Sequence, residues 1–385
     1  MTYSVTHTKG PSSTPSYTIT LPTKGGLLST RNDVSHKDTT QSLFHRLKGQ
    51  QLVIPDLRPM FSHWSSGTNE HYMRMKESVD KKLSLILPSE KHQKAVSDAD
   101  PALLAAKWWP TSSWGRYQTM TDLVIWFGIW DDYVEKLACP LAAQDFRVAT
   151  KKFVTQSLGL ARRTEAPAAP VHPLIQSFKG IADEVCKAFD LEQREQLLKH
   201  FDQYIDATEL EAEFEKAETV PGLDQYWEVR TLTSGMGTLL GMSEFALQVK
   251  LPMHIITSPA YETLWAVTIV INSIVNDLIS FKKEMAAGSV LSSVAILFHQ
   301  SGDLDLAVKL SVEYLQQLVD LYDTTAEVLL QEAAAGQDPE VQQAVSEVVD
   351  LFRMVNTGNL EWSLGAKRYG VSEFIQEDGS IELYL

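Results

Sequence analysis

The stretch Phe127-Gly-Ile-Trp-Asp-Asp-Tyr-Val-Glu135 decides the fold of this chain. It lies in a segment, 120–137, that is apolar on nearly every face and yet carries four carboxylates, three of them within 131–135. A helix of that composition is expected in the interior of a large helical protein. Because unpartnered carboxylates are costly to bury, cations or strong donors must meet Asp131, Asp132 and Glu135.

The spacing of these acids indicates the kind of partner. On a helix, Asp131 and Glu135 are four residues apart, so their side chains project next to each other. Hard oxygen ligands on one rigid face are suited to a divalent cation such as Mg²⁺. The alternative is an ordinary helix end whose acids reach water, with Pro140 ending the helix soon after. A second motif, further along the chain, favours the metal site.

Composition excludes several classes of function. The 385 residues carry a formal net charge of −15, and no strongly basic stripe is visible, so nucleic acid and anionic membranes are not expected partners. The apolar run at 264–275 is too short to span a bilayer and is interrupted by Asn272. Cys139 and Cys186 provide no disulfide framework, and the N-terminus does not read as a signal peptide. We therefore expect a cytoplasmic protein without a membrane span.

The chain reads as one helical domain. From residue 43 onward, apolar residues recur at spacings of three and four, and proline and glycine divide the pattern into segments. We predict a single all-α domain at 41–385, with its helices packed around a common interior. Residues 1–40 are rich in Ser, Thr, Pro and Gly and are expected to form a disordered or loosely attached leader.

The second motif closes the most apolar helix, which is predicted over 259–285. Asn276, Ser280 and Glu284 are spaced four residues apart, so an amide oxygen, a hydroxyl and a carboxylate share one stripe. Such a set offers three oxygens to one Mg²⁺, and the neighbouring Lys283 is able to meet an anion bridged by that metal. A polar helix end with a lysine near the dipole accounts for Lys283. It does not account for three oxygen ligands in register.

Together the motifs resemble those of the class I terpene synthases, in the version typical of microbial and especially fungal cyclases. Asp131-Asp-x-x-Glu135 is similar to the aspartate-rich motif of that family, and Asn276-Asp-x-x-Ser280-x-x-Lys283-Glu284 is similar to its NSE motif. Arg230 stands where the family places a pyrophosphate-sensing arginine. Arg368-Tyr369 is similar to the terminal Arg-Tyr pair of the family.

The resemblance implies a fold, a reaction and a set of site residues. The fold is the all-α isoprenoid synthase bundle around a central apolar cavity. The reaction is Mg²⁺-dependent ionisation and cyclisation of a linear isoprenyl diphosphate, with farnesyl diphosphate and a cyclic sesquiterpene expected, and with release of pyrophosphate. Three Mg²⁺ ions are expected on Asp131, Asp132, Glu135, Asn276, Ser280 and Glu284. Hydrogen bonds to the diphosphate are expected from Arg230, Lys283, Arg368 and Tyr369, which form the catalytic set with Asp131.

The resemblance also places a broken helix after Arg230, bordering the substrate at Thr233 and Ser234. Many bacterial members carry Asp and then Gly at these two positions, so this chain departs from their pattern. Gly235 and Gly237 nevertheless fit a helix that breaks beside a cavity.

Three further side chains are expected to border the substrate. Phe127 lies one helical turn before Asp131, and Trp362 lies seven residues before Tyr369. An aromatic face stabilises a carbocation, although a large aromatic at helical spacing is more often ordinary core. Asn272 continues the polar stripe one turn before Asn276.

Other functions remain open at this point. A chain-elongating prenyltransferase shares the fold and the first motif, but it carries a second aspartate-rich motif where this chain has 276–284. A class II cyclase needs an Asp-x-Asp-Asp motif, and a helical phosphohydrolase needs His-Asp pairs, neither of which is found. A diterpene cyclase acting on geranylgeranyl diphosphate would show the same motifs. A non-catalytic helical protein that retains the fold is the alternative outside enzymes. Dimers are frequent in the family, so a homodimer is an expected assembly.

Overall fold

The computed structural model describes residues 5–9, 15–19, 39–87, 89–161 and 172–385. Most of the expected leader at 1–40 lies outside the described residues. Its described parts include β1 (Val5–Lys9) and β2 (Pro15–Ile19), which pair in antiparallel fashion.

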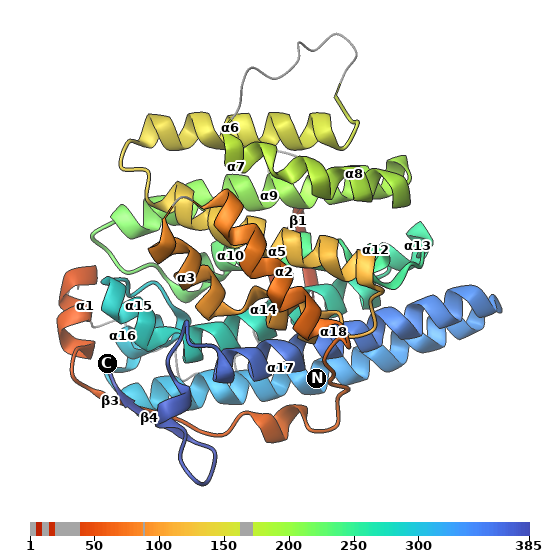
Figure 1. The fold of residues 1–385 in the computed structure, drawn as a ribbon. Helices are drawn as coiled ribbons and strands as arrows, with labels where there is room; N and C mark the ends of the chain where they lie inside the picture. The colour runs from red at the N-terminus through yellow and green to blue at the C-terminus, as the bar shows by residue number, and fades with distance from the viewer. Residues whose placement is uncertain (1–4, 10–14, 20–38, 88, 162–171) are drawn as a thin grey trace.

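The described part of the chain is almost entirely helical (Figure 1), which confirms the predicted all-α class. Its first half contains α1 (Thr40–Leu47), η1 (Arg58–Phe61), α2 (Tyr72–Ile86), α3 (Glu90–Ala99), α4 (Pro101–Trp108), α5 (Trp114–Glu135), α6 (Pro140–Ser157), α7 (Pro173–Gln176) and α8 (Phe178–Ala188). The second half contains α9 (Leu191–Lys216), α10 (Leu223–Thr233), α11 (Met236–Leu240), α12 (Ser243–Leu247), α13 (Met253–Ile256), α14 (Pro259–Ile279), α15 (Phe281–Ala287), α16 (Ser293–Ser301), α17 (Leu304–Ala335), α18 (Pro339–Gly365) and η2 (Ser372–Phe374).

One small sheet joins the two ends of the helical domain. Strand β3 (Gln51–Ile54) pairs antiparallel with β4 (Ile381–Tyr384) near the C-terminus. Alternate residues of both strands are buried, so one face of the ribbon packs on the helices and the other faces solvent. The sequence pattern does not predict this pairing.

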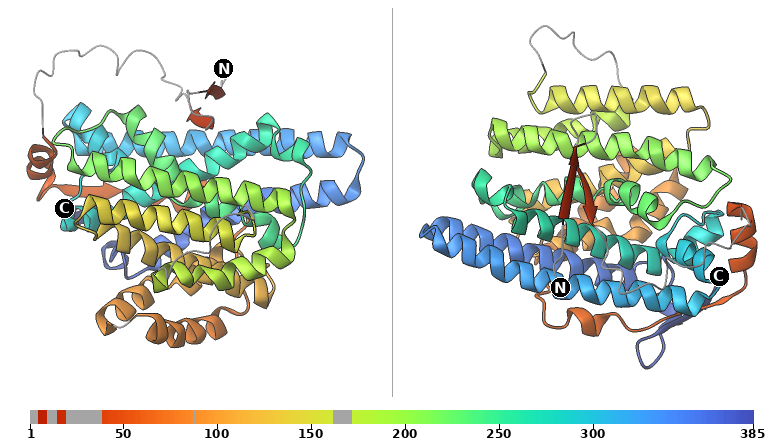
Figure 2. Two further views of the ribbon diagram at one scale, coloured as in Figure 1. Left: turned by 90° about the horizontal axis from the view of Figure 1, so that it is seen from above. Right: turned by 180° about the vertical axis from the view of Figure 1, so that it is seen from behind.

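Helix α14 is the central element. Ser258 caps its first turn by accepting a hydrogen bond from the backbone N–H of Tyr261, and Pro259 occupies the first helical position. It packs on α17 and α18, the long pair along one side of the molecule, while α6, α8 and α9 form the opposite side (Figures 1 and 2). By length and composition α14 could cross a membrane, but 83% of its most apolar window is buried inside the protein. It is therefore a core helix.

Two interruptions of helices shape the region beside α14. Helix α10 ends at Thr233, and Gly235 has a φ of 70° before α11 begins. This left-handed backbone conformation is readily adopted by glycine, and it confirms the break predicted at this point. The helix predicted as continuous over 259–285 is divided at Ser280 into α14 and α15. The Ser280 and Glu284 N–H groups still donate to carbonyls four residues back, so the chain keeps its direction.

Candidate active site

A cavity of about 320 Å³ opens between α3, α4, α5, the α10–α11 break, α14 and α18. This volume is within the range of small-molecule sites. Most of its wall is apolar and comes from Val96, Pro101, Leu104, Trp108, Val124, Ile125, Phe127, Met236, Leu239 and Trp362. Its polar wall comes from Asp131, Asp132, Arg230, Thr233, Ser234, Asn272, Ser273, Asn276, Asn359, Arg368 and Tyr369. The cavity therefore offers an apolar chamber with a strongly polar end.

The acidic motif reaches this polar end from α5. Asp131 accepts a hydrogen bond of 2.7 Å from the hydroxyl of Tyr204 on α9. Asp132 also lines the cavity, and its other contact is an exposed ion pair of 2.9 Å with Lys136. Glu135 lies outside the lining and is exposed to solvent. Of the predicted pair, Asp131 therefore lies in the cavity wall and Glu135 lies outside it.

Arg230 joins the second motif to the C-terminal pair. Its Nη2 donates to the Asn276 amide oxygen at 2.7 Å, and its Nε donates to Asp277 at 3.2 Å. Asn276 in turn donates from Nδ2 to the hydroxyl of Tyr369 at 3.0 Å. Arg368 lines the cavity beside them. Residues from three segments that lie far apart in the sequence therefore meet at one end of the cavity.

The rest of the second motif lies outside the lining. Ser280 is 3% exposed at the junction of α14 and α15. Lys283 and Glu284 follow on α15, where they form a partly exposed ion pair of 2.7 Å. The structure thus brings Asn276 to the cavity wall, while Ser280, Lys283 and Glu284 continue away from it along the same segment.

Helix α9 supplies residues that the sequence analysis did not identify. Tyr204 holds Asp131, and Glu211 accepts a hydrogen bond of 3.0 Å from Thr233 at the α10–α11 break. Glu215 lies one turn after Glu211. Burial raises the pKa of Glu215, and the negative charges of Glu284 and Asp131 raise it further. The spacing of Glu211 and Glu215 was visible in the sequence, but a charged helix face is more often solvated.

Several acidic side chains lie near one another at and around the polar end of the cavity. Burial raises the pKa of Asp131, and the hydrogen bond from Tyr204 offsets this in part. Burial also raises the pKa of Glu211 to about 7, while the charge of Arg230 opposes the rise. Both pKa values are raised mainly because burial removes water from the charged carboxylates.

These residues suit Mg²⁺ by their chemistry. Within the described ranges, no three His, Cys, Asp or Glu side chains lie close enough together to hold an ion by themselves. The candidate oxygen ligands are instead carboxylates on α5 and the amide and hydroxyl groups of Asn276 and Ser280 at the end of α14, which would form a mixed set of hard ligands. A divalent cation bound here would offset part of the stabilisation that these buried carboxylates lose when they leave water.

The predicted aromatics both line the apolar chamber. The ring of Phe127 stacks on Phe201 with centroids 5.6 Å apart and meets the edge of Tyr204 at 4.9 Å. Trp362 donates its indole N–H to the carbonyl of Ala99 and packs edge-on against Tyr369. Each ring is therefore held in place by its neighbours while it contributes to the cavity wall.

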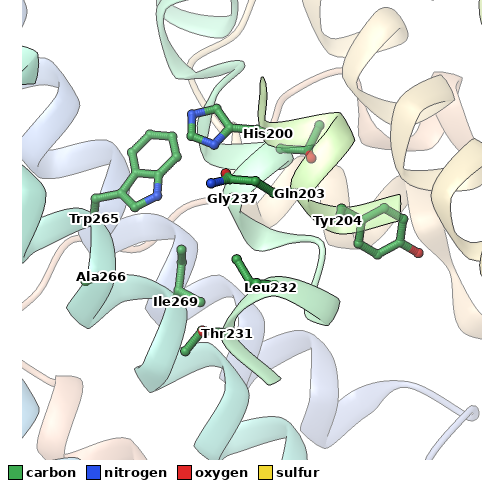
Figure 3. Close-up of a pocket in the computed structure, with 10 residues that line it drawn as sticks. His200, Gln203, Tyr204, Thr231, Leu232, Gly237, Trp265, Ala266 and Ile269 are labelled. Carbon is green, nitrogen blue, oxygen red and sulfur yellow. The ribbon is translucent and has the colours of Figure 1, made fainter. Parts of the chain in front are cut away.

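A second, smaller pocket is lined by residues of α9, α10, α11 and α14 (Figure 3). His200 stacks on Trp265 there, with ring centroids 4.9 Å apart, and Gln203 and Thr231 complete the polar part of the wall. Burial lowers the pKa of His200 to about 4, so the imidazole is neutral at physiological pH. At about 40 Å³ the pocket has room for a few waters at most, which leaves the larger cavity as the candidate active site.

The raised pKa of Glu211 predicts how stability depends on pH in the metal-free protein. Between the ordinary glutamate value of 4.5 and about 7, the folded state binds more protons than the unfolded state. The free energy of unfolding therefore decreases as pH rises through this window. We expect the melting temperature to fall between about pH 5 and pH 7.5, and the fall to be smaller in Glu211→Gln. Thermal denaturation followed by circular dichroism would measure both slopes.

The exposed Glu313, on α17, provides the control for this prediction. Glu313→Gln makes the same chemical change at an exposed position, so it measures how much of the altered slope is specific to Glu211. An unchanged slope in Glu211→Gln would show that Glu211 ionises normally.

Several known proteins are similar to this chain. The model of the family described as "Terpene synthase family 2, C-terminal metal binding" matches residues 122–321. The sesquiterpene cyclase hepA of Aspergillus oryzae is 28% identical, and the match covers 88% of this chain and 95% of that protein. The pristinol synthase of Streptomyces pristinaespiralis is 27% identical, over 69% of this chain and 72% of that protein.

A solved structure shows the same fold. The germacradien-4-ol synthase from Streptomyces citricolor superimposes with a TM-score of 0.65 at 18% identity, over 78% of this chain and 96% of that chain. The match to the family model spans more than half of the 385 residues. This chain therefore belongs to the terpene synthase family, and it is a class I terpene cyclase.

Proposed function

We propose that this cyclase ionises farnesyl diphosphate with Mg²⁺ and closes the resulting cation into a cyclic sesquiterpene, releasing pyrophosphate. The observation that carries this proposal is the hydrogen-bonded set of Arg230, Asn276 and Tyr369, which lines the same cavity of about 320 Å³ as Asp131. The choice of a C15 substrate is supported by the relative named a sesquiterpene cyclase, which matches this chain over 95% of its own length.

The polar end suits the departure of a diphosphate. Negative charge develops on the leaving group as the carbon–oxygen bond breaks, so groups that bind the departing anion lower the barrier. Arg230, Arg368 and Tyr369 present N–H and O–H donors at this end of the cavity, and Lys283 follows on α15. Mg²⁺, when bound, would supply Lewis-acid stabilisation of the leaving group. We assign it to Asp131, Asp132, Glu135, Asn276, Ser280 and Glu284, with three ions as the expected number.

The apolar chamber suits the reactions of a carbocation. A cation is quenched by any nucleophile that reaches it, so the wall must exclude water. Phe127, Trp108 and Trp362 place aromatic surfaces at the wall, where cation–π attraction stabilises positive charge. At the α10–α11 break, Ser234 donates to the carbonyl of Thr231, which fixes the turn beside the cavity at Thr233 and Ser234.

The direct test is incubation of the purified protein with farnesyl diphosphate and Mg²⁺, followed by extraction and gas chromatography–mass spectrometry. We expect a cyclic C15 product that disappears with EDTA and returns when Mg²⁺ is added in excess. Parallel reactions with the C10 and C20 diphosphates measure substrate length. Cyclic product from geranylgeranyl diphosphate alone would instead establish the diterpene cyclase, and product that survives EDTA would contradict the proposed use of metal.

Phe127→Leu is expected to change the product profile while ionisation continues. Leucine fills most of the same volume but lacks the aromatic face. Phe127 lines the chamber, and its described ring contacts are with Trp126, Phe201 and Tyr204, so a leucine there should lower consumption of substrate less than about 10-fold. Product ratios would be measured by gas chromatography and pyrophosphate release by a coupled assay.

Phe178 provides a matched control within the same aromatic cluster. It packs on Phe201 and Trp126 but does not line the cavity. Phe178→Leu should therefore keep the wild-type product ratios. If Phe127→Leu also keeps them, Phe127 is part of the core alone.

Two further proposals concern the cellular location of the enzyme and its assembly. We infer a cytoplasmic enzyme, since the one described helix apolar enough to cross a membrane, α14, is built into the core. The homodimer stays a prediction, which light scattering of the purified protein would test.

A further inference from the structure

Asp277 directly follows Asn276 in the sequence and lies where α10, α14 and α16 meet. It is 3% exposed and does not line the cavity. Its Oδ2 accepts from the hydroxyl of Tyr226 at 2.7 Å and from the backbone N–H and hydroxyl of Ser293 at 2.9 and 2.6 Å. Its Oδ1 accepts from Nε of Arg230 at 3.2 Å. One buried carboxylate thus receives donors from two neighbouring helices.

The two oxygens of Asp277 have different tasks. Oδ2, with its three donors, ties α14 to α10 and α16. Oδ1 faces only the guanidinium of Arg230 among its described hydrogen-bond donors. With Nε held there, Nη2 of Arg230 reaches the amide oxygen of Asn276 at 2.7 Å. Asp277 therefore sets the orientation of the arginine at the cavity wall.

The charge of Asp277 is as important as its geometry. The side chain of Arg230 is 17% exposed, and a buried guanidinium without a carboxylate partner is strongly destabilised. Asp277 is the acid that forms an ion pair with Arg230 in the described part of the chain. Without it, the arginine would turn towards solvent or towards the other carboxylates at the polar end.

We propose that Asp277 is a positioning residue that holds Arg230 against Asn276, so that diphosphate recognition and metal binding depend on one buried carboxylate. This rests on the proposed function, because Arg230 and Asn276 are there assigned to the diphosphate and to Mg²⁺. Asp277 itself touches neither. Its influence on binding passes through Arg230.

Asp277→Asn separates the two tasks. The amide oxygen replaces Oδ2 and continues to accept from the Ser293 N–H, while the amide NH₂ then faces the Nε–H of Arg230, donor against donor. We expect inorganic pyrophosphate, titrated calorimetrically in the presence of Mg²⁺, to bind about 10-fold to 100-fold more weakly than to the wild type. The far-ultraviolet circular dichroism spectrum should be unchanged.

A double-mutant cycle distinguishes positioning from a merely structural role. In an Arg230→Gln background the arginine is absent, so Asp277→Asn should cause no further loss of pyrophosphate affinity. Equal losses in both backgrounds would overturn the proposal, because Asp277 would then act on the fold in general. Glu244→Gln is the matched control: this carboxylate accepts from the backbone N–H of Leu251 and from Gln193, away from the cavity. It should leave affinity unchanged.

Two further measurements complete the test. If Asp277→Asn does not fold, Ser293→Ala provides a milder test, because it removes the hydroxyl donor to Oδ2 of Asp277 and keeps the backbone donor. We expect this variant to bind pyrophosphate roughly 3-fold more weakly in the wild-type background. It should have no effect in the Arg230→Gln background. Equal effects in the two backgrounds would again overturn the proposal. A wild-type protein that binds no pyrophosphate with Mg²⁺ would defeat the proposed function as well. Normal wild-type binding that is retained in Asp277→Asn would defeat the role of Asp277 alone.

Discussion

Asp131→Asn is expected to lower turnover of farnesyl diphosphate by about 1,000-fold or more while the fold stays intact. The substitution removes the negative charge that a divalent cation needs and keeps the shape of the side chain. The amide oxygen still accepts the hydrogen bond from Tyr204, which is 2.7 Å from Asp131 in the wild type. Because burial raises the pKa of Asp131, removing its charge should leave the melting temperature unchanged or raise it.

The measurement is steady-state pyrophosphate release at saturating Mg²⁺, together with a thermal melt of each variant. Asp122→Asn is the control on the same helix, since Asp122 pairs with Lys82 and does not line the cavity. It should keep turnover within about 3-fold of the wild type. Glu284→Gln should lower turnover in the same direction as Asp131→Asn. Near-wild-type turnover in Asp131→Asn would remove Asp131 from the metal site.

Features that depend on one helix were predictable from the sequence. The composition of 259–285 predicted a helix too apolar for the surface, and the structure has most of this segment as the buried helix α14. The spacing of Asn276 and Ser280 predicted that their side chains lie along one stripe. The resemblance placed a helix break after Arg230, and Gly235 provides the left-handed residue at that break between α10 and α11. The resemblance then connected these local patterns to Arg230, which the structure places against Asn276.

Contacts between helices were not predictable in the same way. Tyr204 and Glu211 both lie on α9. Tyr204 contacts Asp131, which is 73 residues away in the sequence, and Glu211 contacts Thr233, which is 22 residues away. Periodicity reports which face of a helix is buried, but it does not report which helix covers that face. The same reason explains Asp277, whose place inside the second motif gives no sign that it supports Arg230 from behind.

The close approach of α4 and α18 is expected to make Gly358→Ala strongly destabilising. A Cβ at position 358 would lie 2.8 Å from the carbonyl oxygen of Lys107 and 2.9 Å from its carbonyl carbon. Backbone atoms cannot turn aside as a flexible side chain can, so the two helices must move apart. Overpacking of this kind costs about 3 kcal/mol, which would lower the melting temperature by several degrees.

The same displacement should reach the cavity, because both helices contribute to its wall. Trp108 follows Lys107 on α4, and Trp362 lies one turn after Gly358 on α18. We therefore expect Gly358→Ala to alter the product profile as well as the stability. Gly365→Ala, at the end of the same helix, has open space around its Cβ and should keep both properties. A melting temperature and product ratio that are unchanged in Gly358→Ala would show that α4 and α18 can separate without disturbing the chamber between them.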